Sequence, residues 1–228
     1  MKEAKKYHIY LFRHGQTTYN RDQKFTGWQN PPLTSLGKKQ AHLLAKKLQH
    51  KKFQVAFQTS LERSKQTLNI ILKSHPECKT IKEDNRMTER NYGSLNGLTH
   101  EKFIDNMGRK LYKLEVEGDL ITELSKEDKK RIEHLLGKEE YDAIHRGFNI
   151  PPLKGESFAD VEKRVHSFVK DLLSFIKKNK VSVAISAHGN SIRLFKKIME
   201  KASVEKTCSW TISHEKVYTY TVEVSPAL

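Results

Sequence analysis

The segment VSVAISAHGNSIR, residues 181–193, decides the fold class. Its first five residues are a short β-branched run, which is typical of a strand buried on both faces. His188 and Gly189 come soon after this run. The chain then continues with a helical pattern, in which apolar residues recur along one helix face: Ile192, Phe195, Ile198 and Met199. The segment therefore predicts a buried strand that delivers a histidine to the start of a helix.

Residues 8–15, HIYLFRHG, show the same order of features: a strand pattern, then a histidine and a glycine. In α/β folds ligands bind at the carboxyl ends of the strands, so we expect His14 and His188 to meet there if their strands are neighbours. The positive charge of Arg13 favours the neutral, nucleophilic form of His14. Backbone N–H groups at the helix start after His188 favour a bound anion. The two histidines thus predict phosphoryl transfer, in which one attacks phosphorus and the other stabilises the transferring oxygens.

Strand-like and helix-like segments alternate along most of the remaining chain. Thr34 is suited to be a helix N-cap, and Ser157 with Asp160 has the pattern of a capping box. The other clear segments are a strand at 55–57, a helix at 61–72 and a strand at 217–224. Such alternation predicts an α/β fold whose mainly parallel sheet has helices on both faces.

Residues from about 99 to 150 interrupt this alternation, because they are highly charged, helical in pattern and without a strand. We interpret them as a helical cap inserted over one edge of the sheet. A chain of 228 residues suits one domain. We therefore expect residues 1–228 to form a single domain that carries this insertion.

The composition favours a polar but folded protein of the cytoplasm, with 36% hydrophobic and 30% charged residues. Cys78 and Cys208 lie far apart in the sequence, which argues against a disulfide framework and fits a reducing compartment. No stretch approaches the roughly 20 apolar residues that span a bilayer, so we expect no membrane partner. The formal charge of +15 comes mostly from scattered lysines on polar helix faces. We therefore expect no nucleic-acid partner, and a positive field that attracts small polyanions such as phosphate esters.

Two further segments carry residues that suit the same chemistry. Arg63 lies in the first turn of a predicted helix, and its planar guanidinium group matches the geometry of a phosphate. Glu89 lies in a polar run and could move a proton to or from an alcohol. The alternatives are an ordinary surface arginine, and a surface ion pair of Glu89 with Arg86 or Arg90.

Several segments resemble the signatures of a known family. They are RHGQTTYNRDQKFTGWQNPPLTSLGKKQA (13–41), TERNYGSLNGLTHEK (88–102), IHRGFNIPP (144–152), GESFADVEKRV (155–165) and SAHGNSIR (186–193). Together they resemble the cofactor-dependent phosphoglycerate mutases of the histidine phosphatase superfamily. The resemblance implies a three-layer α/β sandwich, and the interconversion of 3-phosphoglycerate and 2-phosphoglycerate through a phosphohistidine.

The resemblance also assigns roles to residues of this sequence. His14 would carry the phosphoryl group, and Glu89 would be the general acid and base. The residues that would bind the phosphoryl group are Arg13, Asn20, Arg63 and His188. Those that would hold the rest of the phosphoglycerate are Thr26, Gly27, Arg90, Tyr92, Arg146, Gly189 and Asn190. The implied cofactor is 2,3-bisphosphoglycerate as phosphoryl primer, with no metal. The implied partner is a small-molecule phosphoglycerate, and a homo-oligomer is left open.

The sequence departs from the mutase pattern at His100 and His145, where those mutases have a lysine and an arginine. If both residues face the substrate, imidazolium groups would attract its carboxylate. A free imidazole titrates near about 6.5, and a bound anion raises that value. We therefore expect the Michaelis constant for 3-phosphoglycerate to rise between about pH 6 and 8.

Three other functions are compatible with the same residues. A phosphatase on the same fold would pass the phosphoryl group of His14 to water. A zinc hydrolase could use His14, His188 and Glu89 as ligands, although Arg13 and Arg63 beside them would repel a cation. A basic binding module without phosphoryl transfer would bind RNA in a salt-sensitive way.

Overall fold

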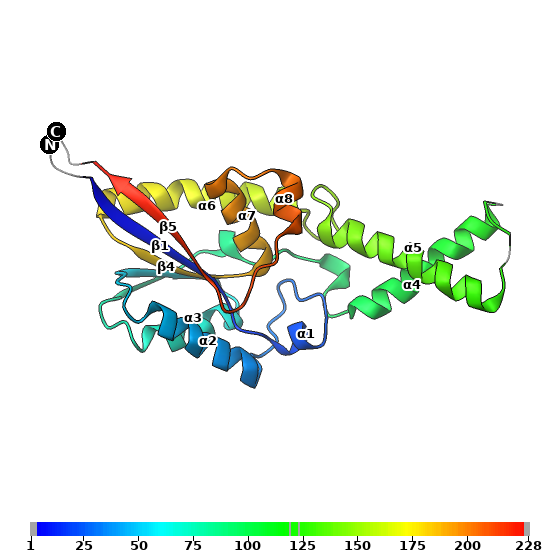
Figure 1. The fold of residues 1–228 in the computed structure, drawn as a ribbon, viewed down its shortest axis with the longest axis horizontal. Helices are drawn as coiled ribbons and strands as arrows, with labels where there is room; N and C mark the ends of the chain where they lie inside the picture. Colours follow the sequence, from blue (N-terminus) through cyan, green and yellow to red (C-terminus); the bar gives the residue numbers. More distant parts are fainter. Residues whose placement is uncertain (1–3, 119, 123, 226–228) are drawn as a thin grey trace.

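The computed structural model describes residues 4–118, 120–122 and 124–225. Its centre is a five-stranded sheet in the order β3-β2-β4-β1-β5 (Figure 1). The strands are β1 (Lys5–Arg13), β2 (Val55–Gln58), β3 (Thr80–Glu83), β4 (Val183–Ala187) and β5 (Val217–Val224). The pairs β3-β2, β2-β4 and β4-β1 are parallel, whereas β5 is antiparallel to β1. Because β1 and β4 are adjacent and parallel, the residues that follow them meet at the same end of the sheet.

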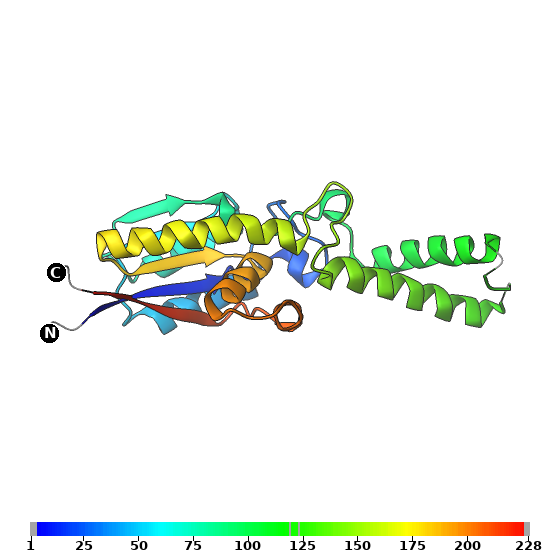
Figure 2. The ribbon, with the colours of Figure 1, turned by 90° about the horizontal axis from the view of Figure 1, so that it is seen from above.

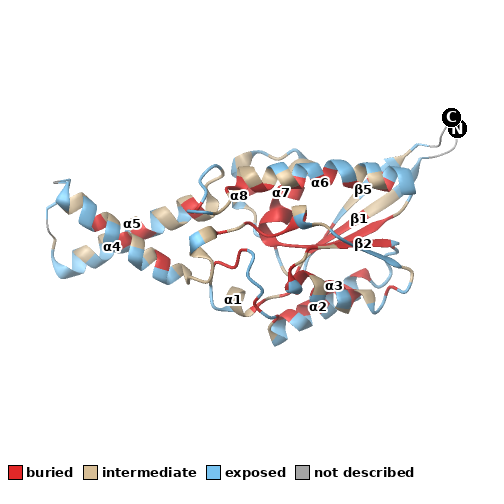
Figure 3. Ribbon diagram, turned by 180° about the vertical axis from the view of Figure 1, so that it is seen from behind, coloured by how far each residue is buried: buried red, intermediate tan, exposed pale blue. Residues whose placement is uncertain are grey.

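Helices cover both faces of this sheet (Figures 1 and 2). One face is covered by α2 (Ser35–Leu48) and α3 (Glu62–Leu72), and the other by α6 (Phe158–Asn179) and α7 (Gly189–Glu200). The side chains of β1 alternate between the two cores that result, with Tyr10 and Phe12 in one and Ile9 and Leu11 in the other. Figure 3 shows the buried residues along the strands and the inner faces of the helices. The predicted sandwich, with a mainly parallel sheet, is confirmed.

Several local signals of the sequence have the expected structure. Thr34 caps α2, since its side chain accepts a hydrogen bond from the Gly37 N–H, and Ser157 with Asp160 forms the capping box of α6.

Strand β3 was not predicted. All four of its residues are exposed at the sheet edge, so it has no apolar alternation that would reveal it. The short helices are α1 (Thr18–Arg21), η1 (Asn85–Met87), η2 (Gly93–Leu95) and α8 (Val204–Ser209).

The insertion is a hairpin of two helices, α4 (His100–Glu117) and α5 (Lys126–Arg146). The sequence led us to expect it over one edge of the sheet, but it does not lie there. Instead it projects away from the carboxyl end of the sheet along the long axis of the molecule (Figures 1 and 2). No helix among the described residues has the length and apolarity needed to cross a membrane.

The two helices of the hairpin are in direct backbone contact at two glycines. A Cβ atom on Gly108 would lie 1.8 Å from the carbonyl oxygen of Glu133, and one on Gly137 would lie 2.0 Å from that of Ile104. The hairpin therefore packs closely through its own helices, without support from the sheet along most of its length.

We predict that Gly108→Ala lowers the melting temperature. In an exposed helix this change usually stabilises by up to about 1 kcal/mol, but here the new methyl group would overlap the Glu133 carbonyl and push the helices apart. Thermal unfolding followed by circular dichroism measures the effect. Lys110→Ala, at an exposed position of the same helix, is the control and should leave the melting temperature nearly unchanged. A higher melting temperature for Gly108→Ala would contradict the close contact.

Candidate active site

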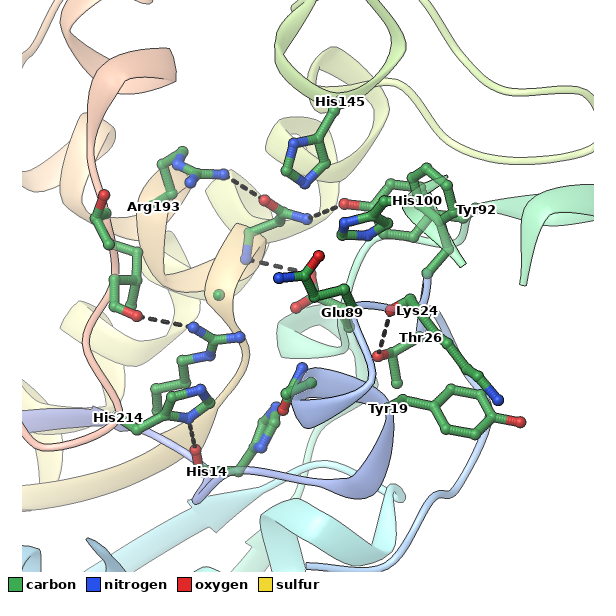
Figure 4. A pocket seen from close by; sticks show the side chains of 18 of the residues that line it. His14, Tyr19, Lys24, Thr26, Glu89, Tyr92, His100, His145, Arg193 and His214 are labelled. Atoms are coloured by element: carbon green, nitrogen blue, oxygen red, sulfur yellow. Dashed lines mark hydrogen bonds between the residues drawn. The ribbon is translucent and has the colours of Figure 1, made fainter. Parts of the chain in front are cut away.

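A cavity of about 320 Å³ opens at the carboxyl ends of β1 and β4, between the sheet and the base of the α4–α5 hairpin (Figure 4). Most of the residues expected at the site line it: Arg13, His14, Asn20, Thr26, Arg63, Glu89, Tyr92, His100, His145, Arg146, Gly189 and Asn190. The fold thus brings together residues from five separate segments of the sequence. His188, Gly27 and Arg90 lie behind this lining.

His14 is held by the pairing of the two central strands. Its N–H donates to the Ala187 carbonyl at 3.1 Å, in line with the register of β1 and β4. The rings of His14 and His188 are 5.0 Å apart between centroids, so the two histidines meet as expected. The His14 Nδ1 atom lies 2.8 Å from the Gly15 carbonyl oxygen. Because a carbonyl can only accept, Nδ1 carries the proton and Nε2 keeps its lone pair.

Arg63 reaches this lone pair from the first turn of α3. Its Nε–H donates to His14 Nε2 at 3.2 Å, and its two other nitrogens donate to the carbonyls of Gln29 at 2.6 Å and Gly27 at 2.8 Å. The Gly27 main chain therefore positions Arg63 and does not line the cavity. Burial of the guanidinium group lowers the pKa of Arg63 to about 10, so the side chain is charged at neutral pH.

Both central histidines are neutral for the same physical reason. Burial, and then the charge of Arg63, lower the pKa of His14 and of His188 well below its ordinary value. His188 Nε2 lies 2.8 Å from the Thr59 hydroxyl oxygen. Within the described part of the chain, no three or more His, Cys, Asp or Glu side chains are grouped as metal ligands, which leaves the zinc-hydrolase alternative without a ligand set there.

Glu89 is the acidic side chain of the cavity lining, and it is only 7% exposed. Its Oε1 accepts from the backbone N–H groups of Arg90 at 2.8 Å and Asn190 at 3.1 Å. Its main-chain carbonyl accepts from Trp28 and Arg164. No hydrogen bond to Oε2 is formed by the residues that the structure describes, so this oxygen is available to a ligand in the cavity.

Arg90 has a different place from the one expected. Its side chain is fully buried and donates to the carbonyls of Glu156 at 2.6 Å, Ile144 at 2.9 Å and Ile150 at 3.2 Å. The guanidinium group thereby joins the end of α5 to the loop before α6, and it packs on the Phe158 ring. Its position behind the lining fits a residue that shapes the cavity wall, and its Nη1 has no hydrogen-bond partner among the described residues.

His100 and His145 lie in an aromatic cluster at the base of the hairpin. The ring of His100 is 4.6 Å from that of Phe25, and its Nδ1 is 3.1 Å from the Tyr141 hydroxyl. The ring of His145 is 4.9 Å from that of Tyr141. Burial, followed by the charge of Arg146, lowers the pKa of His145 to about 3, and burial also lowers that of His100. The assumption that both titrate near neutrality is therefore wrong for the free protein, in which they are neutral at pH 7.

Eight residues of the lining were not assigned from the sequence, and three of them have basic side chains: Lys24, Arg193 and His214. Arg193 belongs to the SAHGNSIR segment and lies one helical turn after Asn190, to whose side-chain oxygen it donates, so its spacing could have revealed it. His214 lies 2.6 Å from the His14 carbonyl oxygen through its Nδ1. It comes from the loop before β5, and only the pairing of β5 with β1 brings it to the site.

Comparison with known proteins places the chain in a family. A family model described as the histidine phosphatase superfamily (branch 1) matches residues 9–119 and 115–225. The chain belongs to this superfamily. A 2,3-bisphosphoglycerate-dependent phosphoglycerate mutase of Nitrobacter winogradskyi is 30% identical over 202 residues, which is 87% of this chain and 83% of the relative. A phosphoglycerate mutase of Schizosaccharomyces pombe is 32% identical over 191 residues, which is 81% of this chain and 75% of the relative.

Solved structures of histidine phosphatase fold resemble the chain over nearly its whole length. The mycobacterial glucosyl-3-phosphoglycerate phosphatase has a TM-score of 0.70 at 19% identity, covering 95% of this chain and 91% of that one. A phosphoglycerate mutase from Bacillus anthracis has a TM-score of 0.68 at 17% identity, covering 99% and 94%. At these identities the likeness shows the fold alone, which this chain shares with both phosphatases and mutases.

We predict that Arg90→Met destabilises this member of the histidine phosphatase superfamily by about 2 to 4 kcal/mol, because the carbonyls of Ile144, Ile150 and Glu156 lose a buried charged donor. Urea unfolding measures the change. Arg109→Met, at an exposed position of α4, is the control and should change stability by less than about 0.5 kcal/mol. If Arg90→Met is as stable as the wild type, Arg90 does not hold the cavity wall together.

We also predict that acid destabilises the protein through its buried imidazoles. An unfolded histidine takes up a proton near about pH 6.5, whereas His145 does so only near 3 in the folded protein. Between these values the unfolded state binds more protons, so the free energy of unfolding rises with pH and is lost as the pH falls through this window. His145→Gln should flatten the dependence between about pH 4 and 6.5, by at most about 1.4 kcal/mol per pH unit.

Urea midpoints at several pH values test this prediction. His134→Gln removes an exposed histidine of the same helix and should leave the slope unchanged. Equal slopes for wild type and His145→Gln would show that His145 titrates alike in the folded and unfolded states.

Proposed function

We propose that this chain is a phosphoglycerate mutase that interconverts 3-phosphoglycerate and 2-phosphoglycerate through a phosphohistidine on His14, in the cytoplasm. The observation that carries the proposal is that one cavity holds both a neutral His14 and the carboxylate of Glu89. The Nε2 lone pair of His14 faces Arg63. Five cationic side chains line this cavity: Arg13, Lys24, Arg63, Arg146 and Arg193. Relatives named as mutases, at about 30% identity over most of both chains, support the same reading.

The donor set of the cavity fits a molecule with two or more anionic groups. Arg13 Nε is buried and has no hydrogen-bond partner among the described residues, so it is a free donor at the phosphoryl end. Lys24, Arg146 and Arg193 provide charge on other parts of the lining. These residues would hold 2,3-bisphosphoglycerate, which when bound would supply the phosphoryl group that loads His14.

The residues of the chain then act as follows in this proposal. The substrate hydroxyl oxygen attacks the phosphorus on His14, the bond from phosphorus to Nε2 breaks, and Glu89 Oε2 takes the hydroxyl proton. Arg13, Arg63, His188 and the N–H groups at the start of α7 stabilise the transferring oxygens. His14 next takes the other phosphoryl group from the doubly phosphorylated molecule, and Glu89 returns its proton to the oxygen that is left.

A phosphatase is the second candidate, and the aromatic cluster favours it. His100 and His145 are neutral where the resembled mutases have permanent charges, so the hold on a substrate carboxylate is weaker. A substrate that leaves after giving up its phosphoryl group would let water attack the phosphohistidine, with Glu89 as the base.

We predict that 3-phosphoglycerate with a trace of bisphosphoglycerate gives mostly 2-phosphoglycerate, measured against free phosphate. The same incubation should leave an acid-labile, base-stable adduct on the peptide that contains His14. His14→Ala should lose both adduct and turnover, whereas His42→Ala, at an exposed position of α2, should keep both. Mostly free phosphate would replace the mutase with the phosphatase, and an adduct that persists in His14→Ala would overturn the phosphohistidine itself.

A further inference from the structure

His214 is a third histidine at the phosphoryl end of the cavity. It lies in the loop that leads into β5, and the antiparallel pairing of Phe12 with Val217 brings this loop beside the end of β1. The same loop holds Arg13, because the Ile212 carbonyl accepts from Arg13 Nη1 at 2.9 Å. The loop before β5 thus contacts both residues of the Arg13-His14 pair.

The two nitrogens of His214 have separate environments. Nδ1 lies 2.6 Å from the His14 carbonyl oxygen, so it must carry a proton. In the neutral ring Nε2 then has a lone pair, and the described residues form no hydrogen bond to it. His214 lines the cavity, with its ring centroid 5.7 Å from that of His14 in an edge-on arrangement (Figure 4). One nitrogen is therefore fixed on the backbone of the nucleophile, while the other is available to a ligand.

The surroundings keep this ring neutral in the free protein. Burial and then the charge of Arg13 lower the pKa of His214 to about 4, against the opposing effect of its bond to the His14 carbonyl. Two groups of titratable or charged side chains face it. His14, just after β1, and Glu89 and Arg193 line the same cavity. Beside its loop are Tyr218 on β5, the neighbouring Glu215, and Lys47 of α2, which donates to the Glu215 carbonyl.

A dianion at His14 changes this balance. The phosphoryl group would bring two negative charges next to Arg13 and His214, and a nearby negative charge favours the protonated imidazole. Protonation at Nε2 converts a lone pair that repels phosphoryl oxygens into a charged donor that binds them. Because Nδ1 is already fixed on the His14 carbonyl, the ring need not reorient.

We propose that His214 is a phosphoryl-binding residue that takes up a proton from solvent when a tetrahedral dianion occupies the site at His14, and then donates from Nε2–H to one of its oxygens. The proposal deepens the proposed function, and it rests only on His14 being the phosphoryl site. It assigns the loop before β5 a part in the chemistry in addition to its part in holding Arg13.

Two substitutions separate this role from a purely structural one. The side-chain amide of His214→Asn can keep the donor at the Nδ1 position, and so the bond to the His14 carbonyl, but it leaves nothing at Nε2. The amide of His214→Gln extends to the Nε2 position and offers a neutral donor that does not titrate. A merely structural His214 would be replaced well by asparagine.

Sulfate is the probe, because it is a tetrahedral dianion that does not titrate near neutral pH. Its dissociation constant for each protein is measured by calorimetry between about pH 6 and 8. Uptake of one proton should strengthen binding to the wild type by up to about tenfold for each pH unit lowered. His214→Asn should lose this part of the dependence and bind about 10- to 100-fold more weakly at the acid end, as expected for a lost charge-assisted hydrogen bond. His214→Gln should bind at an intermediate level with the same flat profile.

A second measurement needs no altered side chain in the sample tested. In protein with ¹⁵N-labelled histidine at pH 7, sulfate should shift the His214 signal, assigned by its loss in either variant, from the neutral Nδ1–H form to the imidazolium form. A signal that stays neutral, or equal pH dependence in wild type and His214→Asn, overturns the proposal. Formation of free phosphate in place of 2-phosphoglycerate would refute the mutase while leaving both of these results unchanged.

Discussion

The site depends on arginines whose side chains donate to main-chain carbonyls. Arg13 donates to Ile212, Arg63 to Gln29 and Gly27, Arg90 to Glu156, Ile144 and Ile150, and Arg193 to Trp210. In the described part of the chain, Arg164 is the arginine near the site that also has a carboxylate partner, Glu156, at 3.0 Å. A buried guanidinium group is costly without such acceptors, so each arginine fixes the loop that surrounds it.

This arrangement leaves positive charge for a ligand. A carboxylate partner would neutralise each arginine, whereas a carbonyl satisfies its donors and leaves its net charge in place. Burial, and then this uncompensated charge, keep His14 neutral and therefore nucleophilic. In the free protein Arg63 Nε–H donates to the His14 Nε2 lone pair. In the proposed reaction this donor would move to a phosphoryl oxygen when Nε2 bonds to phosphorus, so one guanidinium group would stabilise both the free and the phosphorylated histidine.

Much of the fold and the centre of the site could be predicted from sequence because they depend on local patterns. The strand before His188 and the strand before His14 are short apolar runs that end in the same motif, and their pairing brings the rings within 5.0 Å. The place of Arg90 could not be predicted, because a buried structural arginine and a substrate-binding arginine look alike in sequence. His214 was missed for another reason: it is 200 residues from His14, and only the register of β5 against β1 brings the two together.

The titration of His100 and His145 shows the same limit of local reasoning. Their ordinary pKa holds only in water, and the sequence does not show that Phe25, Tyr141 and Arg146 would surround them. Their charge is decided by burial against segments that are distant in the sequence.

Strand β3 could not be found from the sequence for a different reason. It is exposed and contributes little to the core, whereas apolar alternation is the signal by which strands are found.

The site divides between two parts of the structure, and this division bears on what the enzyme does with its phosphoryl group. In the proposed reaction, attack on phosphorus and stabilisation of its oxygens would depend on the ends of β1 and β4 and the start of α7, which are fixed by the sheet. Part of the wall that the substrate body would meet is formed by the first residue of α4 and the last turn of α5. Because the hairpin packs mainly on itself, its residues can change without disturbing the sheet. Under the proposed function, residues at the hairpin base would therefore decide between transfer to a retained alcohol and transfer to water, while the phosphohistidine chemistry would stay the same.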